Sequence, residues 1–425
     1  MKIIMRLFVL TVLLSGCFFT TIKASEPWQN PQLSFEQRTN DLVSRLTLEE
    51  KTELMRFDSP AIPRLGIKAY NWWNECLHGV ARSGQATVFP QAIGMAAMWD
   101  TNQMFDIANA ISDEARAKYH HYQRQEKYGI YQGLTFWTPN INIFRDPRWG
   151  RGMETYGEDP FLTAEMAIPF IKGLQGNDPR YLKLVATVKH FAVHSGPEST
   201  RHSATVWPTD YDLYETYLPH FERTIKEGGA YSVMCAYQRL RGIPCCGSQF
   251  LENILRNNWD FQGYIVSDCG AIQDFYEKKA HNMVATPEES SAMAVKAGTD
   301  LNCGSVYARS LLNAVKKGLL TGSEIDRSVK RLIMARMKLG EFDPENEVPF
   351  AQIPLSEVDG KEHQSIALNA ARKSMVLLKN ENNTLPFSKK IKNVAVIGPN
   401  ANNQEILLGN YNGYSMHQVT PLAGI

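Results

Sequence analysis

Six apolar runs of this chain end in residues whose side chains could do chemistry. In an α/β fold with parallel strands, functional side chains gather at the carboxyl ends of those strands. Six polar ends in succession therefore predict one shared polar pocket rather than six unrelated turns. The polar ends are residues 71–75, 140–151, 189–190, 235–237, 267–269 and Asp300.

Asp268 is the strongest candidate for a reactive group, because it follows the apolar run 264–266 with only Ser267 between them. A carboxylate held rigidly at that point can attack the anomeric carbon of a sugar and form a covalent glycosyl–enzyme intermediate. Lys189 and Arg151 supply positive charge that would keep nearby carboxylates ionised. Basic, phenolic and carboxylic groups together suit a polyhydroxylated ligand, since each buried polar group left unpaired costs about 1–3 kcal/mol.

Each of these residues also has a structural explanation. Asp268 could cap the helix that follows it, and Tyr237 could simply pack in the core. Lys189 and His190 could form a structural pair, since a buried histidine is commonly a satisfied core residue. Residues 145–151 could be a solvated loop held by ion pairs. The case for a pocket therefore depends on all the polar ends together.

The elements that must position these residues follow an alternating pattern typical of an α/β fold with a parallel sheet. The expected strands are residues 67–73, 134–140, 184–189, 230–236, 264–267 and 298–301. The expected helices are residues 35–46, 159–174, 211–227, 248–257, 287–297 and 324–338. Ser34 is placed to cap the first helix, and residues 47–50 resemble a capping box for the next.

The composition changes near residue 341, which divides the chain into four parts. Residues 1–24 are expected to be a signal peptide and residues 25–345 the main α/β domain. Residues 346–390 are expected to be a linker that contains a helix at 363–379. Residues 391–425 then begin a second α/β unit, with a strand at 392–399, and are too few to bury a core of their own.

The chain begins with two basic side chains, Lys2 and Arg6, followed by a short apolar run, as in a secretion signal. Residues 14–17 resemble a lipobox, in which Cys17 would carry a lipid that tethers the protein to a membrane. Ala24 followed by Ser25 resembles an ordinary cleavage site instead. Both alternatives predict a secreted or periplasmic protein. The formal net charge of +1 gives no reason to expect nucleic acid as a partner.

Taken together, the motifs resemble glycoside hydrolase family 3 across nearly all of residues 30–425. No single motif is specific, but their order and spacing are. The matching segments are WWNECLHGVA (72–81), RDPRWGRGMETYGEDP (145–160), KH (189–190), MCAYQRLRGIPCC (234–246), GYIVSD (263–268) and NVAVIGPNA (393–401).

The resemblance implies a (β/α)₈ TIM-like barrel, often irregular, followed by an α/β sandwich domain. It implies a retaining double displacement without metal or organic cofactor, with Asp268 as nucleophile. The remaining residues would bind the sugar or lie beside the nucleophile. By motif position these are Glu75, Arg151, Lys189, His190, Arg201 and Tyr237. The resemblance also suggests disulfides Cys235–Cys246 and Cys269–Cys303, with Cys245 left over.

Two departures from the family's β-glucosidases indicate the substrate. Cys269 stands where they often have tryptophan, and Asn74-Glu75 stands where they often have Asp-Gly. Both features resemble the family's β-xylosidases, and the longer Glu75 side chain would occupy space that a hexose CH₂OH group needs. We therefore expect terminal non-reducing β-D-xylosyl residues of xylo-oligosaccharides as substrate. Glucosidase or α-L-arabinofuranosidase activity are the alternatives.

The general acid/base is the residue that the sequence does not provide. In the family it is usually a glutamate of the second domain, beyond the position where this sequence ends. We therefore expect the 425-residue chain alone to be nearly inactive, unless Glu154 or Glu198 supplies the proton. A non-catalytic sugar-binding barrel is the remaining alternative.

Overall fold

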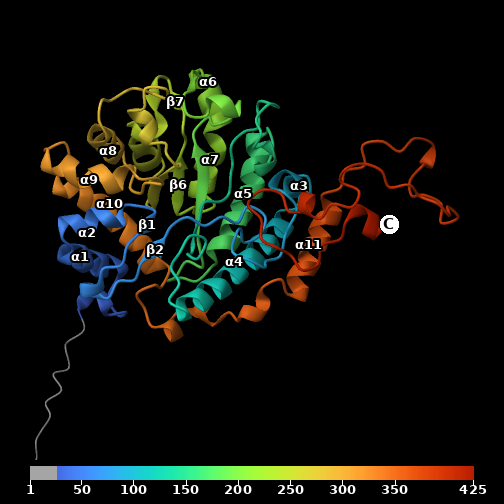
Figure 1. Cartoon of the computed structure of the whole chain (residues 1–425), viewed down its shortest axis with the longest axis horizontal. Helices are drawn as coiled ribbons and strands as arrows, with labels where there is room; N and C mark the ends of the chain where they lie inside the picture. The colour runs from blue at the N-terminus through green and yellow to red at the C-terminus, as the bar shows by residue number, and fades with distance from the viewer. Residues whose placement is uncertain (1–25) are drawn as a thin grey trace, which may run out of the picture.

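The computed structural model describes residues 26–425 as an α/β fold with one large hydrophobic core (Figure 1). The predicted signal peptide, with Cys17, lies outside these residues. No helix within residues 26–425 is long and apolar enough to cross a membrane. The helices are α1 Phe35–Arg45, α2 Leu48–Leu54, α3 Ala92–Ala96, α4 Thr101–Arg124, α5 Pro160–Gln175, α6 Asp210–Asp212, α7 Pro219–Lys226, α8 Pro287–Lys296, α9 Val306–Lys316, α10 Gly322–Lys338, α11 Lys361–Lys373 and α12 Pro421–Gly424.

A curled parallel sheet forms the centre of the molecule, in the order β3-β4-β6-β9. Its strands are buried along their whole length and read as apolar runs, as expected for a parallel sheet covered on both faces. Helices α5 and α7 pack against β4, and α10 packs against β9. The strands are β3 Thr135–Phe136, β4 Val185–Phe191, β6 Ser232–Cys235 and β9 Tyr264–Ser267.

Single bridges continue this sheet into a closed ring. On one side Asn74 bridges Phe136 in parallel, and on the other Val266 bridges Leu301, while Asn302 bridges Arg56. The ring closes where β1 Asp58–Ser59 pairs with β2 Tyr70–Asn71. That last pair is antiparallel, so the ring departs there from a regular barrel of parallel strands.

The sequence predicted several elements closely. The β9 strand is Tyr264–Ser267 as expected, and α1, α5, α8 and α10 lie within two residues of their predicted bounds. Ser34 accepts the Gln37 N–H at 3.2 Å, and Thr47 accepts the Glu50 N–H at 3.2 Å. Both predicted helix caps are therefore confirmed.

Other predicted elements need correction. The helix expected at 211–227 is divided, because Pro219 has no N–H to continue the hydrogen-bond ladder; a π-helical turn, Leu213–Tyr217, separates α6 from α7. The helix expected at 248–257 is a π-helical segment, Glu252–Asn258. The strand expected at 298–301 contributes only the bridge at Leu301.

The region after residue 373 also differs from its prediction. Residues 392–399 form no strand, because within residues 26–425 no neighbouring strand pairs with them and a lone strand cannot satisfy its backbone groups. Figure 1 shows this segment, in red, running away from the body beyond α11. Residues 410–416, which we call the C-terminal strap, return to the ring of strands.

Candidate active site

A cavity of about 260 Å³ at the carboxyl ends of the parallel strands brings together all seven residues singled out from the sequence. Lys189 and His190 belong to β4, Asp268 follows β9, and Tyr237 lies just beyond β6. Arg151 comes from the loop after β3. The full lining is Trp73, Glu75, Trp137, Arg151, Lys189, His190, Arg201, Met234, Tyr237, Asp268, Cys269, Asn410 and Tyr411.

The two oxygens of Asp268 have different environments. The backbone N–H of Cys269 donates to Oδ1 at 2.8 Å, which fixes the carboxylate. Oδ2 has no hydrogen-bond partner among residues 26–425, although Asp268 lines the cavity and is only 6% exposed. Burial raises the pKa of Asp268, and the positive charge of Arg151 opposes that rise. One carboxylate oxygen is thus held while the other is left free for a ligand.

The hydrogen bonds of His190 define its protonation. Asn142 Oδ1 accepts from the His190 backbone N–H at 2.9 Å, so the same oxygen must also accept from the ring Nδ1 at 2.8 Å. Burial, with the charge of Arg151, lowers the pKa of His190 well below its ordinary value. The ring is therefore neutral. Its unprotonated Nε2 lies 3.4 Å from Arg151 Nη2, which donates to it, and 3.5 Å from Asp268 Oδ2. Asp268 Oδ2 is thus the acceptor that lacks a donor there, and a ligand hydroxyl that donates to it would satisfy it.

Lys189 and Glu75 form a buried pair in the cavity wall. Lys189 Nζ lies 3.0 Å from both carboxylate oxygens of Glu75, and each side chain is 3% exposed. Burial nevertheless raises the pKa of Glu75 to about 7, because desolvation outweighs the attraction of Lys189. Neighbouring strand residues normally face opposite sides, but the register of β4 shifts between Lys189 and Phe191. This irregularity lets Lys189 and His190 both line the cavity.

Arg151 is held by Glu154 through two hydrogen bonds, of 3.0 and 2.8 Å. Glu154 is fully buried. Burial alone would raise its pKa, but the charge of Arg151 outweighs that effect and the net pKa is lowered. Glu154 is therefore a structural partner of Arg151, and a poor proton donor.

Tyr237 and Arg201 form the opposite rim of the cavity. The Arg201 guanidinium lies 5.2 Å from the centre of the Tyr237 ring, and the His202 ring lies 4.7 Å from it. Burial and the nearby charge of Asp268 raise the pKa of Tyr237, so its phenol keeps its proton. Glu198 pairs with Arg201 at 2.7 Å and is mostly exposed.

Sequence reasoning missed Asn410 and Tyr411, which the C-terminal strap brings to the cavity. Lys189 Nζ lies 5.0 Å from the centre of the Tyr411 ring, and Asn410 Nδ2 donates to Glu154 at 3.3 Å. His78 Nε2 lies 2.9 Å from the Asn410 carbonyl oxygen. A Cβ at Gly413 would lie 2.6 Å from Ala86 Cβ, so only glycine lets the strap approach this closely. No strand-end pattern marks this segment in the sequence.

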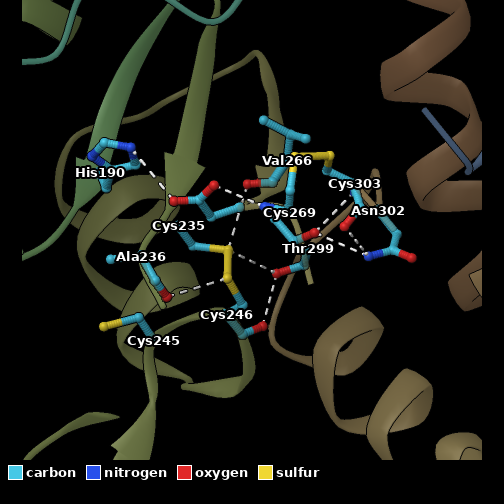
Figure 2. The surroundings of a disulfide bond; sticks show 12 residues. His190, Cys235, Ala236, Cys245, Cys246, Val266, Cys269, Thr299, Asn302 and Cys303 are labelled. Atoms are coloured by element: carbon cyan, nitrogen blue, oxygen red, sulfur yellow. Dashed lines mark hydrogen bonds and ion pairs between the residues drawn. A yellow bond between two sulfur atoms is a disulfide. The ribbon is translucent and has the colours of Figure 1, made fainter. Parts of the chain in front are cut away.

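Both disulfides suggested by the family resemblance are present. Cys235–Cys246 joins the end of β6 to the following turn, and Cys269–Cys303 lies beside the nucleophile candidate. Figure 2 shows the two bridges close to each other and to His190, while Cys245 is separate and remains a thiol. The second bridge ties the residue that donates to Asp268 to the neighbouring segment of the ring.

Two family descriptions match the chain. Residues 35–335 match "Glycosyl hydrolase family 3 N terminal domain", and residues 375–425 match "Glycosyl hydrolase family 3 C-terminal domain". These matches cover the sheet, the helices other than α11, which lies between them, and the segment that contains the C-terminal strap.

Three similar proteins are informative. "Xylan 1,4-beta-xylosidase" of Xylanibacter ruminicola is 50% identical over 405 residues, which is 94% of this chain and 47% of that protein. "Beta-xylosidase/alpha-L-arabinofuranosidase 1" of Medicago sativa subsp. varia is 40% identical over 414 residues, covering 92% of this chain and 52% of that protein. The solved structure of a GH3 exo-β-xylosidase in complex with a xylobiose aziridine activity-based probe has a TM-score of 0.87 and 36% identity, covering 94% of this chain and 52% of that chain. This chain thus spans about half the length of the curated relatives it matches.

Proposed function

We propose, given that the chain belongs to glycosyl hydrolase family 3, that it forms the sugar-binding and nucleophile-bearing part of a retaining exo-β-xylosidase. Its substrate would be the terminal non-reducing β-D-xylosyl residue of a xylo-oligosaccharide. The observation that carries the proposal is the Asp268 carboxylate, with Oδ1 fixed by a backbone N–H and Oδ2 unpartnered beside the neutral ring of His190.

In this proposal Asp268 Oδ2 attacks C1 of the xylosyl unit, forming a covalent ester as the bond to the leaving oxygen breaks. Lys189, His190 and Arg151 bind sugar hydroxyls and hold the ring for in-line attack. Water then attacks C1, releasing xylose and restoring the carboxylate. Glu154 and Glu75 are engaged by Arg151 and Lys189. We therefore assign the acid that protonates the leaving oxygen to neither of these two carboxylates.

Glu75 supports xylose over glucose. Both of its oxygens are bound by Lys189, so the side chain cannot swing aside to admit a CH₂OH group. An α-L-arabinofuranoside is the second candidate, because one relative carries that activity in its name.

The test of the proposed function is turnover of nitrophenyl β-xyloside, β-glucoside and α-L-arabinofuranoside. The assay uses this chain and also the gene product extended through any continuing reading frame. A preference for glucoside would contradict the proposal, and sugar binding without any turnover by either protein would favour a non-catalytic barrel.

Shortening the side chain of Glu75 should lower the selectivity for xyloside over glucoside. Glu75→Asp removes one methylene from the wall and opens space where the hexose CH₂OH would lie. We expect the kcat/KM ratio of glucoside to xyloside to rise about tenfold, the scale of one methylene in a specific pocket. Glu158→Asp, a substitution outside the cavity, is the control and should leave the ratio unchanged. An unchanged ratio in Glu75→Asp would remove Glu75 from the specificity argument.

The pH dependence should report the raised pKa of Asp268. Because attack requires the ionised carboxylate, kcat/KM should fall on the acid side at a pH above the ordinary aspartate value of 3.8. Arg151→Met removes a charge that opposes the rise, so it should move this limb to higher pH, whereas Arg151→Lys should restore it. Arg148→Met is the matched control, since Arg148 is 75% exposed and pairs with Asp146 outside the cavity. If Arg151→Met does not shift the pH at which kcat/KM falls on the acid side, a group other than Asp268 is responsible for that fall.

We also propose export of the protein to an oxidising compartment, which the two disulfides support. Mass spectrometry of the mature N-terminus would distinguish a lipid on Cys17 from cleavage before Ser25. A cytosolic protein with an intact Met1 would contradict the proposal.

A further inference from the structure

A cluster of large apolar side chains lies exposed on segments that follow the cavity residues Arg201 and Tyr237 in the chain. Trp207 is 71% exposed, Tyr211 is 76% exposed and Tyr214 is 55% exposed, with Ile243 at 44% on a neighbouring strand. Aromatic side chains in such numbers on a surface commonly mark a binding site rather than part of a core. The function proposed above does not use them.

The cluster is built on a small sheet rather than on a loose loop. Strands β5 Thr205–Val206, β7 Arg239–Leu240 and β8 Ile243–Pro244 form this sheet, and Trp207 directly follows β5. The Trp207 ring lies across the β7–β8 turn, 3.7 Å from the position of a Cβ on Gly242. Arg241 in the same turn donates to the Pro208 carbonyl at 2.9 Å and to Asp210 at 2.6 Å. These bonds fix Trp207 relative to the start of α6, where Tyr211 lies.

Two strands of this sheet, β5 and β7, follow residues that line the cavity. Tyr237 lies two residues before the start of β7, and Arg201 lies four residues before the start of β5. The Arg239 backbone N–H donates to the Ala204 carbonyl at 3.0 Å, so the two segments leave the cavity side by side. A second, small cavity shares Arg201 with the main one and is also lined by Ala204 and by Val206, the residue before Trp207.

The size of the main cavity requires a place for the rest of an oligosaccharide. Its volume of about 260 Å³ is at the low end for a ligand pocket and suits one sugar unit. The units on the leaving-group side must therefore pass over the rim. On the Arg201 side the chain leaves the cavity through β5 and continues to Trp207 and Tyr211.

We propose that Trp207 and Tyr211 form an outer subsite that binds the reducing-end units of a β-xylo-oligosaccharide whose first unit lies in the cavity. Their ring faces would pack against the apolar C–H faces of the sugar, while Arg241 and Asp210 meet its hydroxyls. This inference rests on the proposed function and deepens it, because it assigns a preference for chains over disaccharides. Asp268 and the other cavity residues remain responsible for the chemistry.

Calorimetric titration of this chain with xylose, xylobiose and xylohexaose tests the subsite, with Asp268→Asn in every protein to prevent turnover. Affinity should rise from xylobiose to xylohexaose. Trp207→Ala should remove the rise and weaken xylohexaose binding about fivefold, the scale of one aromatic packing contact. Xylose and xylobiose binding should not change. Trp207→Phe, which keeps an aromatic face, should retain most of the gain.

Trp99→Ala is the matched control. Trp99 is 78% exposed but lies between α3 and α4, and Figure 1 shows α3 well apart from β7. This variant should bind xylohexaose like the parent. Equal binding of xylohexaose by Trp207→Ala and the parent would overturn the subsite, as would an affinity independent of chain length. If no xylose-based sugar binds at all, the proposed function itself fails.

Discussion

Asp268→Asn should abolish covalent labelling by a 2-fluoro-xyloside and lower turnover of nitrophenyl β-xyloside by about 10⁴-fold or more, as loss of a catalytic nucleophile does. The amide has nearly the shape of the carboxylate, so the cavity should still bind xylose. Intact-mass spectrometry followed by peptide mapping gives the result directly. In the parent, the added mass should lie on the peptide that contains Asp268.

Asp274→Asn provides the comparison for that experiment. Asp274 is a buried carboxylate six residues further along, but its partner is His202 and it does not line the cavity. Labelling should survive in this variant. A label on Glu154 or Glu75, or parental turnover by Asp268→Asn, would show that the nucleophile is assigned to the wrong carboxylate.

Lys189→Met should cause the largest loss of stability among changes in the cavity. It leaves Glu75, 2% exposed, without its partner, and breaking a buried pair in this way typically costs about 3–5 kcal/mol. The folded-state pKa of Glu75, about 7, is raised above its ordinary value of 4.5. Charging Glu75 as the pH rises through that interval therefore costs stability, and more so without Lys189. We expect the loss to be larger at pH 8 than at pH 5 when urea unfolding is measured at both.

An exposed pair on α7 provides the control. Lys226 Nζ lies 2.6 Å from Glu222, and the two side chains are 47% and 42% exposed. Lys226→Met should therefore change the free energy of unfolding by no more than about 0.5 kcal/mol. Adding Glu75→Gln to Lys189→Met should recover part of the loss at pH 8, since the unpaired charge is gone. An equal loss at both pH values, with no recovery, would trace the effect to packing instead.

The sequence predicted where the parallel strands end, because a buried parallel strand must be mostly apolar and the residues after it need not be. That contrast located Asp268, Lys189 and Tyr237 at one face without knowledge of the strand lengths. The corresponding pattern for helices, an apolar stripe on one face, did not reveal the long helix α4. Its side chains Glu114, Arg116 and Lys118 are buried and interrupt that stripe. Asp100, which caps the first turn through the Gln103 N–H at 2.9 Å, was the available signal.

The cavity itself was only partly predictable. The register shift in β4 that turns both Lys189 and His190 to one side depends on pairing with β6, and no local pattern in the sequence records it. The tautomer of His190 depends on Asn142, which lies 48 residues earlier in the chain. Asn410 and Tyr411 reach the cavity only because the chain returns after a long irregular excursion. Such long-range contacts are set by tertiary packing, and the spacing of residue types along the chain does not predict them.

The return of the C-terminal strap has a consequence for how this protein is divided. Tyr411 and Asn410 complete a cavity whose other walls lie between residues 73 and 269. The backbone of the strap is bonded to Arg82, Gly84 and Ala86, at the opposite end of the chain. A boundary drawn near residue 345 separates the ring of strands from its own binding wall, so the smallest piece able to enclose a sugar is larger than the first domain.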